Sequence, residues 1–160
     1  VFEKFIQHIF KEAAKETGGR LYSNFKFHSR TSKHYSWELK HIEPDAIFQK
    51  ENVLVFIDGK YKSNLYNKFD QSEVLKEDHR HDLHQIMAYY SFSKADFKYG
   101  FLCYPSDQIE LKSIQYKNGI NEATNTILNL GVPLKKDSIN ETKRLLTNEL
   151  NEIERRTTTR

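Results

Sequence analysis

Asp45, Asp58 and Lys60 are the residues of this sequence whose types and spacing could do chemistry. Asp58 and Lys60 follow the apolar, mostly β-branched run 53–57, which is typical of a buried strand. Side chains alternate across a strand, so Asp58 and Lys60 share one face. A polar turn joins this run to the run 46–48, and the resulting hairpin can bring Asp45 alongside Asp58. The sequence therefore predicts two carboxylates and an ammonium at the end of a core strand.

The chemistry that such a group supports is metal-dependent hydrolysis of a phosphodiester. Paired carboxylates hold a hard divalent cation, Mg²⁺ or Mn²⁺, which prefers oxygen ligands and keeps several waters. The cation offsets charge on the phosphate and acidifies a bound water, and a nearby ammonium can help to position or deprotonate that water. Gly59 leaves the backbone open, so its carbonyl could also reach the metal. Lys62 lies on the same strand face as Lys60.

Two patterns at these positions resemble the motifs of a large nuclease superfamily, the PD-(D/E)xK nucleases. The first pattern consists of Pro44-Asp45 followed by Asp58-Gly59-Lys60. The second is the QxxxY pattern of Gln85 and Tyr89, which is found on the helix after the motif strand in some branches of that superfamily. Residues four apart lie on one helix face, so both side chains can point to the same site.

Over residues 1–105 the chain looks most similar to the nuclease subunits of McrBC-type, modification-dependent restriction systems. The resemblance implies a restriction-endonuclease-like core that cleaves double-stranded DNA carrying methylated or hydroxymethylated cytosine. It also implies a partner, an AAA+ motor that hydrolyses GTP. The sequence has no glycine-rich nucleotide loop, so that motor must be another polypeptide.

The same resemblance implies a role for each motif residue. Asp45 and Asp58 would bind Mg²⁺ or Mn²⁺, and Lys60 would orient or activate the attacking water. Gln85 and Tyr89 would support the site.

Other polar residues leave alternatives open. In relatives the first helix often points a glutamate toward the metal, so Glu3 is a candidate third carboxylate; the alternative is a solvated surface glutamate. The cations of the loop 29–34 could contact phosphate or could belong to an ordinary solvated loop. Residues 63–79 have no clear period, and their place beside the motif strand suits contact with substrate. The histidines at 79, 81 and 84 favour a helix N-terminus with Asp82 near its positive end, because a zinc site would need a fourth ligand.

The function has alternatives as well. One is a stand-alone restriction or repair nuclease, or an exonuclease, that uses the same site. Another is a catalytically silent DNA-binding module of the same fold. The intact set of Asp45, Asp58 and Lys60 argues against the silent module, because such a module has no chemical use for all three.

The elements that must position these side chains form an α/β pattern. Apolar residues between 2 and 13 recur at helical spacing, and Gly18-Gly19 ends that helix. Strands are expected around Phe25 and Phe27, at 46–57, at 99–104 and at 109–116, the last two joined by a tight hairpin. Helices are expected at 82–90, at 118–130 and from Ser138 onward. We therefore expect a mixed β-sheet flanked by α-helices.

Length and composition set the remaining bounds. The 160 residues are enough for one domain that buries roughly 70% of its unfolded surface. Because the chain starts inside a helical pattern without a methionine, we expect residues 1–160 to be the C-terminal part of a longer subunit. The net charge of +3 permits nucleic-acid binding without arguing for it. The single cysteine, Cys103, excludes an internal disulfide and fits a reducing cytoplasm. No apolar run in residues 1–160 is long enough to span a membrane, and we expect no signal sequence within them.

Overall fold

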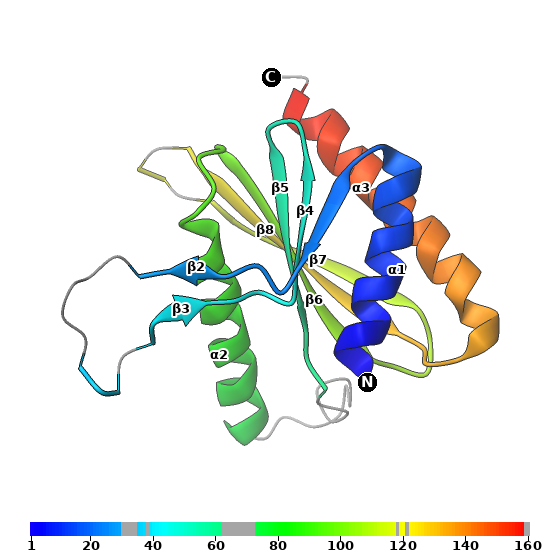
Figure 1. Ribbon diagram of the computed structural model, residues 1–160, viewed down its shortest axis with the longest axis horizontal. Coiled ribbons are helices and arrows are strands. Elements are labelled where there is room, and N and C mark those ends of the chain that lie inside the picture. The colour runs from blue at the N-terminus through cyan, green and yellow to red at the C-terminus, as the bar shows by residue number, and fades with distance from the viewer. Residues whose placement is uncertain (30–34, 38, 62–72, 118, 121, 159–160) are drawn as a thin grey trace.

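A mixed β-sheet with helices on both faces forms the centre of the computed structural model, which describes residues 1–29, 35–37, 39–61, 73–117, 119–120 and 122–158 (Figure 1). Within these ranges the elements, in chain order, are α1 (Phe2–Thr17), β1 (Arg20–Ser23), β2 (Phe27–His28), β3 (His41–Ile42), β4 (Ala46–Lys50), β5 (Val53–Gly59), α2 (Glu73–Tyr90), β6 (Phe97–Pro105), β7 (Glu110–Lys117), β8 (Thr124–Val132), the 3₁₀-helix η2 (Lys136–Ser138) and α3 (Ile139–Thr158). The expected α/β fold is confirmed.

The main sheet has the strand order β1-β4-β5-β6-β8-β7. The central strands β5, β6 and β8 are parallel, and the outer pairs are antiparallel. The predicted hairpin is the pair β4–β5, in which Ala46 lies opposite Ile57. Its tight turn is possible because Glu51 adopts a left-handed conformation, with φ of 52°. The helix α1 ends where the sequence predicts, since Gly18 is also left-handed, with φ of 77°.

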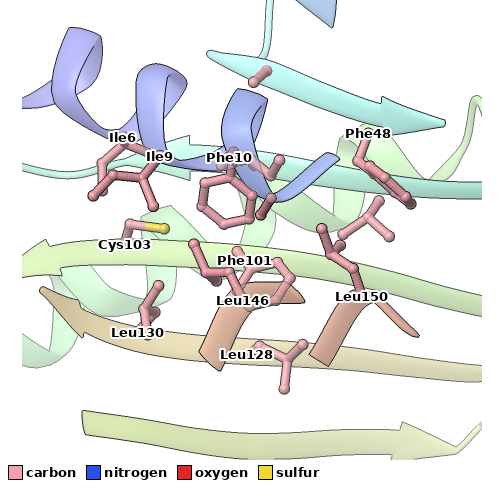
Figure 2. Close-up of a cluster of buried hydrophobic side chains, with 14 of the residues drawn as sticks. Ile6, Ile9, Phe10, Phe48, Phe101, Cys103, Leu128, Leu130, Leu146 and Leu150 are labelled. Carbon is pink, nitrogen blue, oxygen red and sulfur yellow. The ribbon is translucent and has the colours of Figure 1, made fainter. Parts of the chain in front are cut away.

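The helices α1 and α3 cover one face of this sheet. Their apolar stripes pack on alternate residues of the strands, and Figure 2 shows this cluster around Phe10, Phe48 and Phe101. Phe10 and Phe101 meet edge to face, with ring centroids 5.1 Å apart. Each fully buried side chain of this kind contributes roughly 1.5–3 kcal/mol, so this core fixes α1 firmly beside the end of β5.

The helix α2 covers the opposite face. Ile86 and Tyr90 of α2 pack there with Phe56 of β5 and Leu102 of β6. The approach is close because β6 has Gly100 at the contact, where an added Cβ would lie 2.7 Å from the Tyr90 hydroxyl and 2.8 Å from Ile86. Asp58 and Lys60 share strand parity with Phe56, so α2 lies on the face that carries them.

The strand expected around Phe25 and Phe27 is confirmed at Phe27–His28, where it pairs with β3 in a separate two-stranded sheet, and the first strand of the main sheet, β1, was not predicted. Two other predictions were wrong. The strands β6 and β7 do not form a hairpin pair, because β8 lies between them. The helix expected at 118–130 is wrong, because residues 124–130 belong to β8; residues 118 and 121 lie outside the described residues. Ile127 and Leu128 are both buried because helices cover both faces of the sheet, and this removes the period-2 signature from the sequence.

The start of α2 was also predicted wrongly. The helix begins at Glu73, so Asp82 lies in its interior and not at its positive end. The first two turns carry mostly polar residues because much of their surface is in water, and the apolar period that marks a helix appears only from Leu83 onward.

Candidate active site

Asp45 and Asp58 lie side by side at one end of the β4–β5 hairpin. Because Ala46 pairs with Ile57, the next residues along the two strands are Asp45 and Asp58. The Gly59 backbone N–H donates a hydrogen bond of 2.7 Å to Asp45 Oδ2. Asp58 is only 4% exposed. The structure thus brings the two predicted carboxylates together, with Gly59 between them.

The two carboxylates resist ionisation in this setting. The pKa of Asp45 is raised to about 7, chiefly by burial and also by the charges of Asp58 and Glu3, against the opposing effects of the Gly59 N–H and Lys60. Burial likewise raises the pKa of Asp58, while Lys60 opposes the shift. Desolvated carboxylates that repel each other gain free energy when a divalent cation neutralises them.

Lys60 points its ammonium into a group of three oxygen atoms. Lys60 Nζ lies 2.5 Å from Asp58 Oδ2 and 3.6 Å from Asp82 Oδ1. It also donates a short hydrogen bond to Gln85 Oε1. The backbone of Lys60 is fixed as well, since its N–H donates to the Cys103 carbonyl of β6 at 2.8 Å. An ammonium has three donors and no acceptor, so this arrangement matches its charged form.

The two residues of the QxxxY pattern act at different points. Gln85 accepts the hydrogen bond from Lys60, as described above. Tyr89 is 1% exposed and donates a hydrogen bond of 3.3 Å to the Glu43 carbonyl. Burial raises the pKa of Tyr89, and the nearby Asp58 and Asp45 carboxylates add to that shift. Tyr89 therefore ties α2 to the segment that leads into Asp45.

Glu3 lies near Asp45 within a network of amides. Gln7 Nε2 contacts Glu3 Oε1 at 3.2 Å and the Asp45 carbonyl at 2.8 Å. Asn24 Nδ2 donates to the same Glu3 oxygen at 3.1 Å, and the Asn24 N–H donates to the Asp45 carbonyl at 3.1 Å. The side chain of Glu3 is thus held on the Asp45 side of the site.

A comparison with known families decides what this arrangement belongs to. The family described as "McrBC 5-methylcytosine restriction system component" matches residues 1–105. That range runs from α1 through β6 and contains every candidate site residue. The chain belongs to this family. A search of curated proteins gives no match.

A solved structure has a similar fold. It is a chain in the refined half-complex from the tetradecameric assembly of Thermococcus gammatolerans McrB AAA+ hexamers with bound McrC. The two chains are 14% identical, with a TM-score of 0.52. The match covers 95% of this chain and 32% of the other, so this McrBC family chain spans about a third of the length of its structural neighbour.

Three other points raised by the sequence concern a histidine metal site, membrane helices and the loops that could contact the substrate. No group of three or more His, Cys, Asp or Glu side chains in the described ranges is placed to hold a metal ion, and this includes the three histidines of α2. None of the described helices is long and apolar enough to cross a membrane. Lys62, residues 63–72 and most of the loop 29–34 lie outside the described residues.

Sequence reasoning missed three side chains that shape the site of this McrBC family chain. Asp82 was placed at a helix end, yet it is 1% exposed and faces Lys60. Its position three residues before Gln85 is the signal that could have found it. Gln7 lies one turn after Glu3 on α1, so the same spacing rule applies to it. Asn24 has no such signal, because its φ of 55° comes from the turn after β1.

Proposed function

We propose that this chain is a metal-dependent DNA endonuclease domain, the cleavage part of a modification-dependent restriction system. The observation that carries the proposal is the apposition of Asp45, Asp58 and Lys60 at the end of β5, with Lys60 Nζ 2.5 Å from Asp58 Oδ2. Two carboxylates and an ammonium are a set of groups that can support metal-dependent hydrolysis of a phosphodiester. The membership of the McrBC family supports the same reaction class.

The residues present fit Mg²⁺ or Mn²⁺. Asp45 and Asp58 supply hard oxygen donors in a partly dry position, and their raised pKa values reflect burial and repulsion that a cation would relieve. The Gly59 carbonyl is a further candidate ligand. Glu3 is not grouped with the two aspartates in the described structure, so it would have to move toward them to serve as a third carboxylate ligand. When bound, the metal supplies charge neutralisation at the phosphate and a more acidic water.

The side chains around the carboxylates have separate tasks in this proposal. Lys60 places a positive charge and donor hydrogens beside Asp58, where they can orient the attacking water and stabilise developing negative charge on the phosphate. Gln85 holds the Lys60 ammonium in place through its Oε1. Tyr89 fixes α2 to the Glu43 carbonyl and thereby keeps Gln85 in register with the strand.

Membership of the family supports a proposal for the substrate and the partners. We propose double-stranded DNA with methylated cytosine as substrate, and an AAA+ GTPase as the partner that drives cleavage in the cytoplasm. The structural neighbour comes from an assembly of McrB AAA+ hexamers with bound McrC, and this chain spans about a third of the neighbour's length. We therefore propose that residues 1–160 form the endonuclease domain in the C-terminal part of a longer subunit. The net charge of +3 is small for a domain that holds DNA without help.

The test is cleavage of methylated plasmid by the full-length subunit, with and without its motor partner and GTP. We expect cleavage that depends on the motor and on Mg²⁺. Asp58→Asn and Lys60→Ala should each lower the rate by about a hundredfold or more, because each removes a few kcal/mol of transition-state stabilisation. Glu77→Gln, on the exposed face of α2, is the matched control and should cleave normally.

Each contrary outcome has a clear meaning. A folded Asp58→Asn or Lys60→Ala variant that cleaves at the wild-type rate would refute the proposed site. Cleavage by the subunit alone, unaffected by motor or nucleotide, would leave a self-sufficient restriction or repair nuclease. DNA binding without any cleavage, with motor, GTP and metal all present, would leave a silent DNA-binding module.

A further inference from the structure

A third carboxylate, besides Asp45 and Asp58, lies close to Lys60. Asp82, in the interior of α2, is 1% exposed, and its Oδ1 lies 3.6 Å from Lys60 Nζ. His81 Nδ1 lies 4.0 Å from the same oxygen, but the His81 side chain is 78% exposed and is charged only when protonated. Lys60, with a side-chain exposure of 15%, is therefore the closer and drier cation for Asp82.

A buried carboxylate in the interior of a helix needs a reason. Moving a charge out of water costs several kcal/mol unless a partner charge and hydrogen bonds compensate for it. An apolar residue at position 82 would avoid that cost, and Ile86, one turn later on α2, already belongs to the apolar cluster under this helix. The acid at this position is therefore better explained by the charge that it faces than by packing.

Metal binding at Asp58 would remove the partner charge of Lys60, and this explains a second carboxylate beside the ammonium. Without a metal, Lys60 Nζ lies 2.5 Å from Asp58 Oδ2 and neutralises it. When Asp58 binds a divalent cation, that oxygen is shared with a second positive charge, and the cation repels the ammonium. Lys60 must then be held by other oxygens, and those that face it on α2 are Asp82 Oδ1 and Gln85 Oε1.

We propose that Asp82 is a positioning residue that takes over the charge of Lys60 when Asp58 binds metal. This inference rests on the proposed metal-dependent function. Asp82 and Gln85, three residues apart on one helix face, form a charged and a neutral acceptor for the same ammonium. Asp82 thereby frees Asp58 for the metal and keeps Lys60 beside the reacting phosphate. Asp82 itself contacts neither the metal nor the phosphate.

The test is a double-mutant cycle on Mn²⁺ affinity, measured by titration calorimetry on the full-length subunit. The four proteins are the wild type, Asp82→Asn, Lys60→Met and the double variant. We expect Asp82→Asn alone to weaken Mn²⁺ binding about 10- to 100-fold, which is the range for removing a residue that supports a metal site from outside the coordination shell. In the Lys60→Met background the same change should alter affinity by less than about twofold, because no ammonium competes for Asp58.

A rescue variant separates this role from a structural one. Gln85 already bonds Lys60, so adding Gln85→Glu to Asp82→Asn returns a negative oxygen to the ammonium. We expect this variant to regain most of the lost Mn²⁺ affinity. If Asp82→Asn fails to fold, Asp82→Asn with Gln85→Glu serves in its place and should bind Mn²⁺ within about threefold of wild type. Glu77→Gln removes a carboxylate from the exposed face of α2 and should leave affinity unchanged.

The outcomes distinguish this inference from the proposed function. An equal loss of Mn²⁺ affinity in both backgrounds would show that Asp82 acts directly on the metal or on the fold, and would overturn the inference. So would an Asp82→Asn variant with wild-type affinity, or failure of Gln85→Glu to rescue. A wild-type subunit that binds no Mn²⁺ at all would refute the proposed function itself, and the inference with it.

Discussion

Replacing Asp45 by asparagine should stabilise the metal-free protein, and the gain should grow with pH. Burial raises the pKa of Asp45 from 3.8 to about 7. A carboxyl group with a raised pKa in the folded state stabilises the protein fully below its unfolded pKa, and this contribution is lost as the pH rises through 7. The wild type should therefore lose stability between pH 5 and pH 8. The asparagine amide has no such proton to lose, and its oxygen can still accept the Gly59 N–H.

The size of the effect follows from the shift. Each pKa unit is worth about 1.4 kcal/mol, so the full shift corresponds to about 4 kcal/mol. Between pH 5 and pH 8 the linkage releases roughly two of those pKa units, or about 3 kcal/mol. Because the Asp45 side chain is only partly buried, solvent screens part of this free energy, and we expect about 1–2 kcal/mol. For a chain of this length that equals roughly 2–8 °C in melting temperature.

The assay is urea unfolding of wild type and Asp45→Asn in a metal chelator at pH 5, 6, 7 and 8. Asp107→Asn, which changes an exposed carboxylate in the turn after β6, is the control and should track the wild type. The difference between Asp45→Asn and wild type should widen mainly between pH 5 and pH 7 and level off toward pH 8. A difference that stays constant with pH, or a wild type that becomes the more stable protein at pH 8, would refute the reasoning.

Two further predictions concern the same side of the site. Mn²⁺ should raise the melting temperature of the wild type by mass action, with little effect on an Asp45→Asn/Asp58→Asn double variant; equal shifts in both proteins by calorimetry would place the metal elsewhere. Gln7→Met should cost roughly 1–3 kcal/mol in urea unfolding, because a buried amide that contacts Glu3, Asn24 and the Asp45 carbonyl is lost. Gln115→Met on the exposed edge strand β7 is its control, and equal costs for both variants would contradict the argument.

The sequence was sufficient for the strands that carry the motif. The alternation of side chains along β5 and the turn chemistry of the β4–β5 hairpin are local properties, so they placed Asp45 beside Asp58 and set Lys60 on the same face. The four-residue spacing of Gln85 and Tyr89 is local as well. Their arrival at Lys60 and at the Glu43 carbonyl is not, because it depends on how closely α2 packs on Gly100.

The elements that sequence reasoning missed are those whose environment is set by distant parts of the chain. The strand β8 lies between β6 and β7 and is covered by helices on both faces, so its apolar residues follow no strand period. The first two turns of α2 have little apolar surface, which hid the true start of the helix. That single error misplaced Asp82, because a residue expected at a helix end is judged by the helix dipole and not by its partners.

The site is therefore assembled from α1, the β4–β5 hairpin and α2, and an apolar core on each face of the sheet fixes their positions. The core under α1 places Gln7 and Glu3 against Asp45, and the core under α2 places Asp82 and Gln85 against Lys60. The hairpin between them carries Asp58, which contacts Lys60 directly. The charges of Asp58 and Asp45 act on each other, and Asp82 of α2 also raises the pKa of Asp58, so the helices and the hairpin set the charge of the pair together. Under the proposed function, these fixed neighbours would keep the site in place while Asp58 exchanges the Lys60 ammonium for a divalent cation.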